Sequence, residues 1–444
     1  MCRNGALEKP DSHCVRKPAS KIADLTLAQS FKPFAAPVFL LTLAMMTLYS
    51  GAWIVRDVIF GVSPIPIAAL RVVGAPLMIL GLLAIAVAPL RAARLAYDNL
   101  ALVMLILWAG LSVLWSVDPG TSFQRVLTIA VALIAAAGLV LRFSPKILAQ
   151  LVVLTTCIGM SLSLMLWLSG DALAVDQIAG GVRGAFTHKN VLGQITAIGT
   201  LLGIGLLQRP GARLLGAAAV VLGVICLMVA RSATAIASTM AGILILYVLA
   251  VIGSRRLPPF VKPAMALAGL VGGVLFVLAY PLVLEALGRD ASLTGRDQIW
   301  QFTLDRWEQR PWLGHGFRAF WTADYNRGLI ASNFWARYDQ SHNGYLQILL
   351  DLGLVGLGLF LAWLVSVLGR SLRLLGDPDL RMWISLWAAF IVYSFTEAIY
   401  LTPNGFTWLV IMLAGMVTGY SVARPASRYG GQASTPLSAV TFNG

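Results

Sequence analysis

Charged residues are scarce in this chain of 444 residues, and that scarcity indicates its class. Only 12% of the residues are Asp, Glu, Lys or Arg, and 58% are hydrophobic, whereas soluble domains carry about twice that charged fraction. Cysteine is scarce too: the four cysteines show no metal-binding or redox spacing and imply no disulfide framework. These absences exclude an ordinary soluble domain and a disulfide-rich secreted module.

Motifs for nucleotides and metals are missing as well. The segment Gly314-His-Gly316 lacks the strand, the later glycines and the lysine of a phosphate loop. No carboxylate spacing suits Mg²⁺, and His315 and His342 are far apart in the sequence. No internal repeat is visible, whereas inverted repeats are common in secondary transporters. The sequence therefore predicts no cofactor and no metal, and it makes a flippase or transporter the less favoured alternative.

Long apolar runs are abundant. Their lengths of about 17 to 25 residues are those needed to cross a bilayer as a helix. The alternating ten-residue strands of a membrane β-barrel are not seen. We predict an all-α integral membrane protein with about twelve transmembrane helices, at 36–54, 65–89, 100–116, 126–141, 147–169, 191–208, 214–230, 235–253, 264–284, 344–367, 383–401 and 405–422.

The formal net charge of +14 is distributed unevenly between the loops. With the N-terminus inside, each inner segment contains Lys or Arg, as the positive-inside rule requires. This alternation predicts a multi-pass protein with both termini in the cytoplasm: a tail at 1–35, helices one to nine at 36–284, helices ten to twelve at 344–422, and a disordered tail at 423–444. The tail at 1–35 has no apolar core and does not read as a secretory signal.

One long polar loop, 285–343, interrupts the apolar runs and is expected to lie in the periplasm. It is rich in arginine, tryptophan and tyrosine. Its stretch Arg296–Trp307 predicts an amphipathic helix on the membrane surface, and a second helix is expected within 318–336. Its aromatic residues suit either stacking on sugar faces or anchoring at the membrane interface.

Two ionisable residues are predicted to lie inside apolar spans, Arg71 and Glu397. An arginine at such a depth is costly unless it is paired or lines a wet cavity. Arg71 and Glu397 could form a structural ion pair. Alternatively, Arg71 faces a polar cavity that is open to the outside.

Other cations are expected just below the outer membrane face: Arg183 and Lys189 in the loop 170–190, Arg231 after the span 214–230, and Arg296 in the long loop. Clustered guanidinium groups bind phosphate oxygens bidentately, which suits an anionic lipid headgroup. An ordinary phospholipid is the competing ligand for Arg231. His342, at the outer mouth of the span 344–367, could act as a general base or simply cap that helix.

Several short motifs, in this order and topology, are characteristic of one family. They are Trp115-Ser-Val-Asp-Pro119, Arg183-Gly-Ala-Phe-Thr-His-Lys-Asn190, Gly295-Arg296 with Trp300, Gly314-His-Gly316, Ser341-His342-Asn343-Gly-Tyr345 and Asp351-Leu-Gly-Leu-Val-Gly356. Together they resemble the O-antigen ligase / polysaccharide polymerase superfamily over nearly all of the membrane region. The form Phe-Thr-His-Lys-Asn looks most like the exopolysaccharide polymerisation proteins of that superfamily.

The resemblance implies a metal-independent, inverting glycosyltransferase at the outer face of the bacterial inner membrane. Its donor would be a polyprenyl-diphosphate-linked glycan, and polysaccharide export or chain-length proteins are possible partners. Carried over by motif, His342 would activate the acceptor hydroxyl, and Arg183 and Arg296 would hold the diphosphate. The remaining candidate substrate-binding residues are Arg71, Lys189, Arg231 and Asn343.

Two matters stay open at this point. The enzyme could polymerise exopolysaccharide repeat units, or it could be a ligase that transfers a finished glycan to lipid A–core. Asp351 matches an acidic position of the family, but it follows His342 by nine residues on an expected helix. That spacing turns it about 180° away, so we expect no direct contact between Asp351 and His342.

Overall fold

The computed structural model describes residues 35–52, 56–57, 61, 73–177, 180–254, 256–272, 296–333 and 338–422. Among these residues the chain is almost wholly helical, and strand pairing is limited to a bridge between Val175 and Val182. The predicted all-α architecture is therefore confirmed. The helices are α2 (Ala35–Tyr49), α4 (Ala75–Val87), α5 (Pro89–Asp98), α6 (Leu100–Leu111), η3 (Ser112–Trp115), α7 (Pro119–Arg142), α8 (Pro145–Leu168), η4 (Ala172–Ala174), α9 (Lys189–Leu207), α10 (Arg213–Ala230), α11 (Ala233–Ile252), α13 (Arg296–Trp307), α14 (Asp324–Asn333), α15 (Gly344–Leu372), α16 (Pro378–Tyr393) and α17 (Phe406–Val422).

The apolar helices have the lengths that a membrane requires. Six described helices (α7 to α11 and α15) are long and apolar enough to cross it, and the bent pair α4–α5 raises this number to seven. Shorter apolar helices include Val261–Gly272 and Phe406–Gly419. The predicted number of about twelve spans stays a prediction, because parts of the expected spans 65–89 and 264–284 lie outside the described residues.

Proline and capping residues account for where individual helices begin. Pro89 opens α5 after a 109° bend from α4, since proline suits the first turn of a helix but not its interior. Asp118 accepts a hydrogen bond from the Thr121 amide and caps α7. For this reason α7 starts seven residues before the predicted span 126–141.

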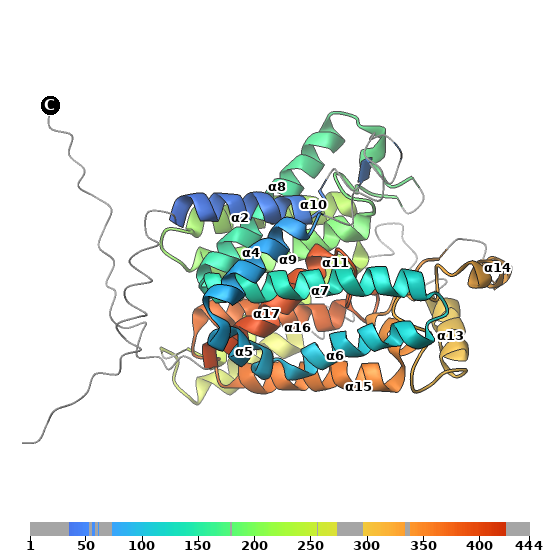
Figure 1. Cartoon of the computed structure of the whole chain (residues 1–444). Helices are drawn as coiled ribbons and strands as arrows, with labels where there is room; N and C mark the ends of the chain where they lie inside the picture. The colour runs from blue at the N-terminus through green and yellow to red at the C-terminus, as the bar shows by residue number, and fades with distance from the viewer. Residues whose placement is uncertain are drawn as a thin grey trace, which may run out of the picture.

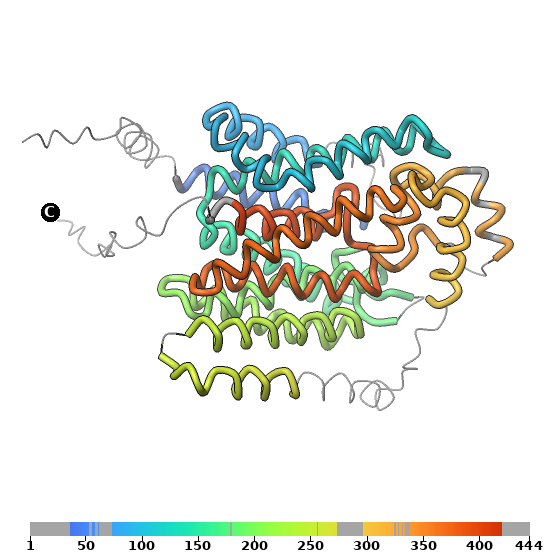
Figure 2. Tube along the Cα trace, turned by 90° about the horizontal axis from the view of Figure 1, so that it is seen from below, coloured from blue at the N-terminus to red at the C-terminus, as the bar shows by residue number. Residues whose placement is uncertain are grey.

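The long helices lie side by side in a bundle, with α13 and α14 gathered at one end (Figures 1 and 2). The start of α2 and the end of α17 lie together at the opposite end. Helix α9 is central, because it packs on α8, α10, α11 and α16. Most of its residues are buried inside the bundle. The bundle thus has one end that carries the long polar loop and another that carries both ends of the described chain.

Small residues allow close helix crossings inside this bundle. Gly81 of α4 faces Gly138 of α7, and a Cβ at either position would overlap the backbone of the other helix. Such small-residue contacts let helix backbones approach one another, which is how packing stabilises helices in a membrane.

Helix α15 is broken near its start, and the long loop fills the break. Gly353 has φ 67° and ψ −167°, which removes it from the helix. The amide of Leu354 donates to the carbonyl of Pro311 (2.8 Å), and the amide of Gly316 donates to the carbonyl of Asp351 (3.0 Å). The loop therefore satisfies backbone groups that could not be left unpaired within the membrane.

The same loop is tied to the connection between α6 and α7. The amide of Val117 donates to the carbonyl of His315 (2.9 Å), and the Ser112 hydroxyl accepts from the amide of Phe317 (3.0 Å). Three of the family motifs, those around residues 115–119, 314–316 and 351–356, thus meet in one structural junction.

The predicted helix over Arg296–Trp307 is present as α13. Its apolar side, Ile299 and Phe302, packs against Phe320, Trp321 and Leu350 of the protein in a small buried cluster. Trp321 is therefore part of a core and is not available to stack on a sugar. The second helix predicted in the loop, over 318–336, begins later than expected: its described part covers Asp324–Asn333, and 334–337 lie outside the described residues.

Candidate active site

The polar end of the bundle centres on the carboxylate of Glu397. This residue follows α16, which ends at Tyr393 rather than continuing to 401 as predicted. The glutamate side chain is only 4% exposed. A carboxylate so deeply buried must be paired or hydrogen-bonded.

Three side chains from distant parts of the sequence contact this carboxylate. Arg296 Nη2 donates to Oε1 at 3.0 Å, and Asn190 Nδ2 donates to the same oxygen at 2.6 Å. The other oxygen, Oε2, lies 3.4 Å from Nδ1 of His342. The start of α9, the start of α13 and the turn before α15 therefore converge on one anion.

His342 is held in an unusual backbone conformation. Its φ is +49°, a region that non-glycine residues rarely adopt and that often marks functional sites. On either side the chain is fixed: the Ser341 hydroxyl donates to the carbonyl of Asn343 (2.8 Å), and Asn343 caps α15 by accepting from two backbone amides. These bonds fix the position of the histidine ring at the helix mouth.

The two ring nitrogens of His342 have different surroundings. Nδ1 faces Glu397, at an ion-pair distance rather than a well-formed hydrogen bond. Nε2 forms no hydrogen bond with any described residue. A carboxylate behind one nitrogen and an unoccupied second nitrogen is the arrangement of a general base that is oriented by an acid.

Asp351 supports this site without touching His342. Its Oδ2 accepts from Gln347 Nε2 (2.9 Å), and Gln347 Oε1 in turn accepts from the backbone amide of Ser341 (3.0 Å). The other neighbour of Asp351 is Arg318 Nε, 3.9 Å away. The acidic position of the family motif is thus connected to the histidine through one side chain and one backbone amide.

Arg318 is a buried cation that the sequence did not single out. It has φ +54°, and its Nη2 donates to the carbonyls of Ala398 (3.2 Å) and Tyr400 (2.7 Å). Burial lowers its pKa. These bonds hold the non-helical turn that presents Glu397, so Arg318 is a positioning residue for the carboxylate.

His188 belongs to the same end of the bundle but is built differently from His342. Its Nδ1 accepts from the Asn190 amide (3.1 Å) and caps α9, while its Nε2 faces Asp176 at 3.4 Å. Burial lowers the pKa of His188, outweighing the opposite effect of Asp176. We therefore assign it as a neutral capping histidine. Asn190, two residues further along the chain, was not predicted as a site residue, yet it makes the contact to Glu397.

The predicted cations are spread around this centre. Arg183 is 8% exposed and donates from Nε to the carbonyl of Leu173 (2.6 Å). Burial lowers its pKa, opposed mainly by Asp176. Lys189 is buried at the first turn of α9, next to Asn190. Arg183 thus belongs to the loop that surrounds His188, whereas Arg296 contacts Glu397 directly.

Arg231 ends α10 in the left-handed conformation (φ 48°) and is exposed. The loop that carries Arg183 runs beside it, since the amide of Val182 donates to the carbonyl of Val229 (3.0 Å). Arg71, and with it the proposed pairing of Arg71 with Glu397, lies outside the described residues. Among the described residues the partners of Glu397 are Arg296, Asn190 and His342.

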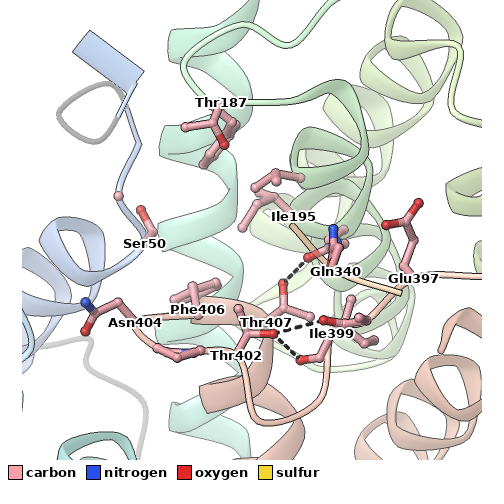
Figure 3. A pocket seen from close by; sticks show the side chains of 17 residues that line it. Ser50, Thr187, Ile195, Gln340, Glu397, Ile399, Thr402, Asn404, Phe406 and Thr407 are labelled. Carbon is pink, nitrogen blue, oxygen red and sulfur yellow. Dashed lines mark hydrogen bonds between the residues drawn. The ribbon is translucent and has the colours of Figure 1, made fainter. Parts of the chain in front are cut away.

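A cavity of about 260 Å³ adjoins Glu397 (Figure 3). It lies between α9 and the turn 397–407, and it extends from Glu397 at one edge to Ser50 and Asn404 at the other. Inside it the Thr407 hydroxyl donates to Gln194 Oε1 at 2.9 Å.

Comparison with known proteins finds one matching sequence family and two similar proteins. A sequence family described as O-antigen ligase matches residues 218–361, which include Arg231, Arg296 and His342. The exopolysaccharide production protein ExoQ of Rhizobium meliloti (strain 1021) is 29% identical over 256 residues, which are 53% of this chain and 58% of that protein. The O-antigen ligase of Pseudomonas aeruginosa is 33% identical over 127 residues, 29% of this chain and 28% of that protein. The matches thus span little more than half of one relative and less than a third of the other.

Proposed function

We propose, from its similarity to the O-antigen ligase family over residues 218–361 and to the two relatives above, that this chain is a member of the O-antigen ligase superfamily and a glycosyltransferase of the bacterial inner membrane that joins polyprenyl-diphosphate-linked repeat units into an exopolysaccharide. The observation that carries the proposal is the buried carboxylate of Glu397, which contacts both a candidate base, His342, and a candidate diphosphate ligand, Arg296. A proton acceptor and a cation are thereby held beside one another at one end of the bundle.

In the proposed reaction His342 activates the acceptor. The sugar hydroxyl lies against Nε2, and its oxygen attacks the anomeric carbon of the donor from the side opposite the diphosphate. The bond from the anomeric carbon to the diphosphate oxygen breaks, and its electron pair leaves with the diphosphate. The hydroxyl proton passes to Nε2, and the imidazolium that forms is stabilised by Glu397, 3.4 Å from Nδ1.

Arg296 supplies the charge that the leaving group needs. One of its nitrogens is engaged by Glu397, and a guanidinium has further donors with which to bind phosphate oxygens. Arg183, Lys189 and Arg231 add positive charge around the same end of the bundle. Polyprenyl diphosphate is already a good leaving group. Preorganised cations can therefore supply the charge stabilisation that it still needs, without a metal.

The arrangement of the bundle supports the predicted orientation. The described chain begins and ends at the end opposite α13 (Figures 1 and 2), and the first residue of α13, Arg296, contacts Glu397. Arg142 and Lys146 flank the connection from α7 to α8, Arg209 lies in the connection from α9 to α10, and Arg213 is the first residue of α10. Basic connections mark the cytoplasmic side, so we place both termini in the cytoplasm and the site at the periplasmic face.

Reconstitution tests the proposed function. Purified protein in liposomes receives only a polyprenyl-diphosphate-linked repeat unit, and the products are separated by length on a gel. We expect a ladder of lipid-linked oligomers from the wild type and none from His342→Ala at an equal protein level. Full activity of His342→Ala would refute the assignment of His342 as the base. Absence of glycan transfer by the wild type under every condition would refute the proposal that the protein is a glycosyltransferase.

A ligase is the second candidate, because one relative is an O-antigen ligase. A ligase would give no ladder from the donor alone but a single transfer product after lipid A–core is added. The same liposomes therefore distinguish the two activities, which differ only in the acceptor.

A further inference from the structure

The cavity beside Glu397 has a lining that the proposed reaction has not yet used. Its walls come from the residues just after α2, from α9 and the residues before it, and from the segment 397–407, which includes the start of α17 (Figure 3). Its volume of about 260 Å³ is just below the range of about 300–1,000 Å³ that is typical for drug-sized ligands. A space of this size suits one or two sugar rings, not a long glycan.

The described lining of the cavity does not favour a diphosphate. Among the described residues that line it, Glu397 is the single ionisable one. None of the cations Arg183, Lys189 and Arg296 contributes to its walls. A diphosphate placed there would lie against the carboxylate of Glu397, and Arg296, the cation bound to that carboxylate, does not contribute to the described walls; like charges at short range in a buried site are unfavourable.

The uncharged groups of the lining match a carbohydrate instead. Gln194 and Thr407 form a hydrogen-bonded pair in the wall, and Gln340 and Thr402 add further donors and acceptors. The aromatic ring of Phe406 adds an apolar surface. A few placed polar groups in a largely apolar hollow are typical of a specific ligand site.

We propose that this cavity binds the terminal sugar of the acceptor glycan; the inference rests on the proposed function. Glu397 both lines the cavity and contacts His342. Gln340, two residues before His342, lines the cavity as well. The cavity therefore lies beside the turn that carries the base, and a glycan whose terminal sugar occupies it extends from this turn. The donor, which carries the diphosphate, is left to the side of Glu397 on which Arg296 binds.

The test replaces the polar pair in the wall by apolar groups of nearly the same shape, Gln194→Leu with Thr407→Val. Removing both partners leaves neither of them unpaired. Tyr393, which also contacts Gln194, keeps its hydrogen bond to the carbonyl of Asn190 (3.2 Å), so the fold is expected to tolerate the change. Thr196→Val is the matched control: it lies on the same helix, its hydroxyl bonds to its own helix at the carbonyl of Leu192 (2.8 Å), and it does not line the cavity.

Two probes are titrated onto each protein in nanodiscs. One is the repeat-unit oligosaccharide released from its lipid, and the other is polyprenyl diphosphate without sugars. We expect the double variant to bind the oligosaccharide about tenfold more weakly, as the loss of two hydrogen bonds implies, and to bind polyprenyl diphosphate as the wild type does. Thr196→Val is expected to bind both probes normally.

Turnover separates the acceptor from the donor. With the oligosaccharide as acceptor, the double variant should raise KM for the acceptor and leave KM for the lipid-linked donor unchanged. Gln340→Met, on a different wall, should act in the same direction and serves if the double variant misfolds. Unchanged oligosaccharide binding, weaker polyprenyl diphosphate binding, or a rise only in KM for the donor would each overturn the proposal. Failure of the wild type to transfer any glycan would instead refute the proposed function.

Discussion

Replacing Glu397 by glutamine removes one charge from the centre of the site and almost nothing else. The amide oxygen of glutamine can still accept from Arg296 and Asn190, which both contact Oε1. What disappears is the negative charge facing Nδ1 of His342. If His342 gains a proton during transfer, Glu397→Gln should slow that step and spare substrate binding.

The size of the effect follows from the distance. Two unit charges 3.4 Å apart interact by about 5 kcal/mol at an effective dielectric constant of about 20. His342 is 23% exposed, so solvent screens part of this energy, and about 2–4 kcal/mol remains as stabilisation of the transition state, or about 30- to 1,000-fold in kcat. KM for the donor should not rise, because the lost carboxylate repels the diphosphate.

The assay is turnover of a lipid-linked repeat unit in proteoliposomes, with kcat and KM measured separately. Asp305→Asn is the control, since Asp305 is an exposed carboxylate on the same helix as Arg296; it should behave as the wild type. Adding Glu397→Gln to His342→Ala should cost little more, because both residues serve one step.

A kcat within about threefold of the wild type, which is less than 1 kcal/mol in the barrier, would refute the orienting role of Glu397. A rise in KM for the donor at unchanged kcat would show instead that Glu397 organises Arg296 rather than His342.

Four further outcomes are expected. Arg296→Lys should reduce activity with the lipid-linked donor in the proteoliposome assay, because lysine lacks the bidentate fork; a neutral result would mean that Arg296 only packs. Gly316→Ala should lower the apparent Tm by an amount corresponding to about 1–3 kcal/mol, because Gly316 has φ +97° and a Cβ there would overlap Ser116. Gly328→Ala is the control: a Cβ at Gly328 meets only open space, so the Tm should not change. The pKa of His188 is lowered in the folded protein, which favours the neutral ring. The stability that this provides is present above about pH 6.5 and is lost as the pH falls toward the pKa of the folded state. The wild-type Tm should therefore drop between pH 7 and 5, and His188→Asn, which keeps a capping side chain, should flatten that drop. EDTA should leave transfer unchanged, and strong inhibition would contradict a metal-independent mechanism.

Some residues of the site could be predicted from the sequence, but their contacts could not. His342 and Arg296 were named from a motif and from the position of the long loop, and the structure brings both to one carboxylate. Glu397 was noticed because a carboxylate inside an apolar segment needs a partner. Its partners could not be deduced, because Asn190 is 207 residues away in the sequence and Arg296 is 101 residues away.

Motifs that look alike in the sequence have different roles in the structure. The Gly314-His-Gly316 segment contains a histidine between two glycines and could have been a binding loop. In the structure both glycines have positive φ and pack on the backbone of Asp351 and on Ser116, so the motif seals the break in α15. His188, in a motif with a lysine and an asparagine, turns out to be a helix cap.

By itself the sequence determined the all-helical membrane character and the position of most helices, and it predicted the side of the membrane on which the site would lie. These properties follow from local quantities: the length of an apolar run, a capping side chain, a proline, the side on which lysines and arginines gather. Only the tertiary structure decided which helices are neighbours, that α16 stops before Glu397, and that this carboxylate faces both His342 and a hollow lined by uncharged polar groups. An apolar surface indicates that a helix is covered, but many partners could cover it, and the choice among them is made by the packing of the whole bundle.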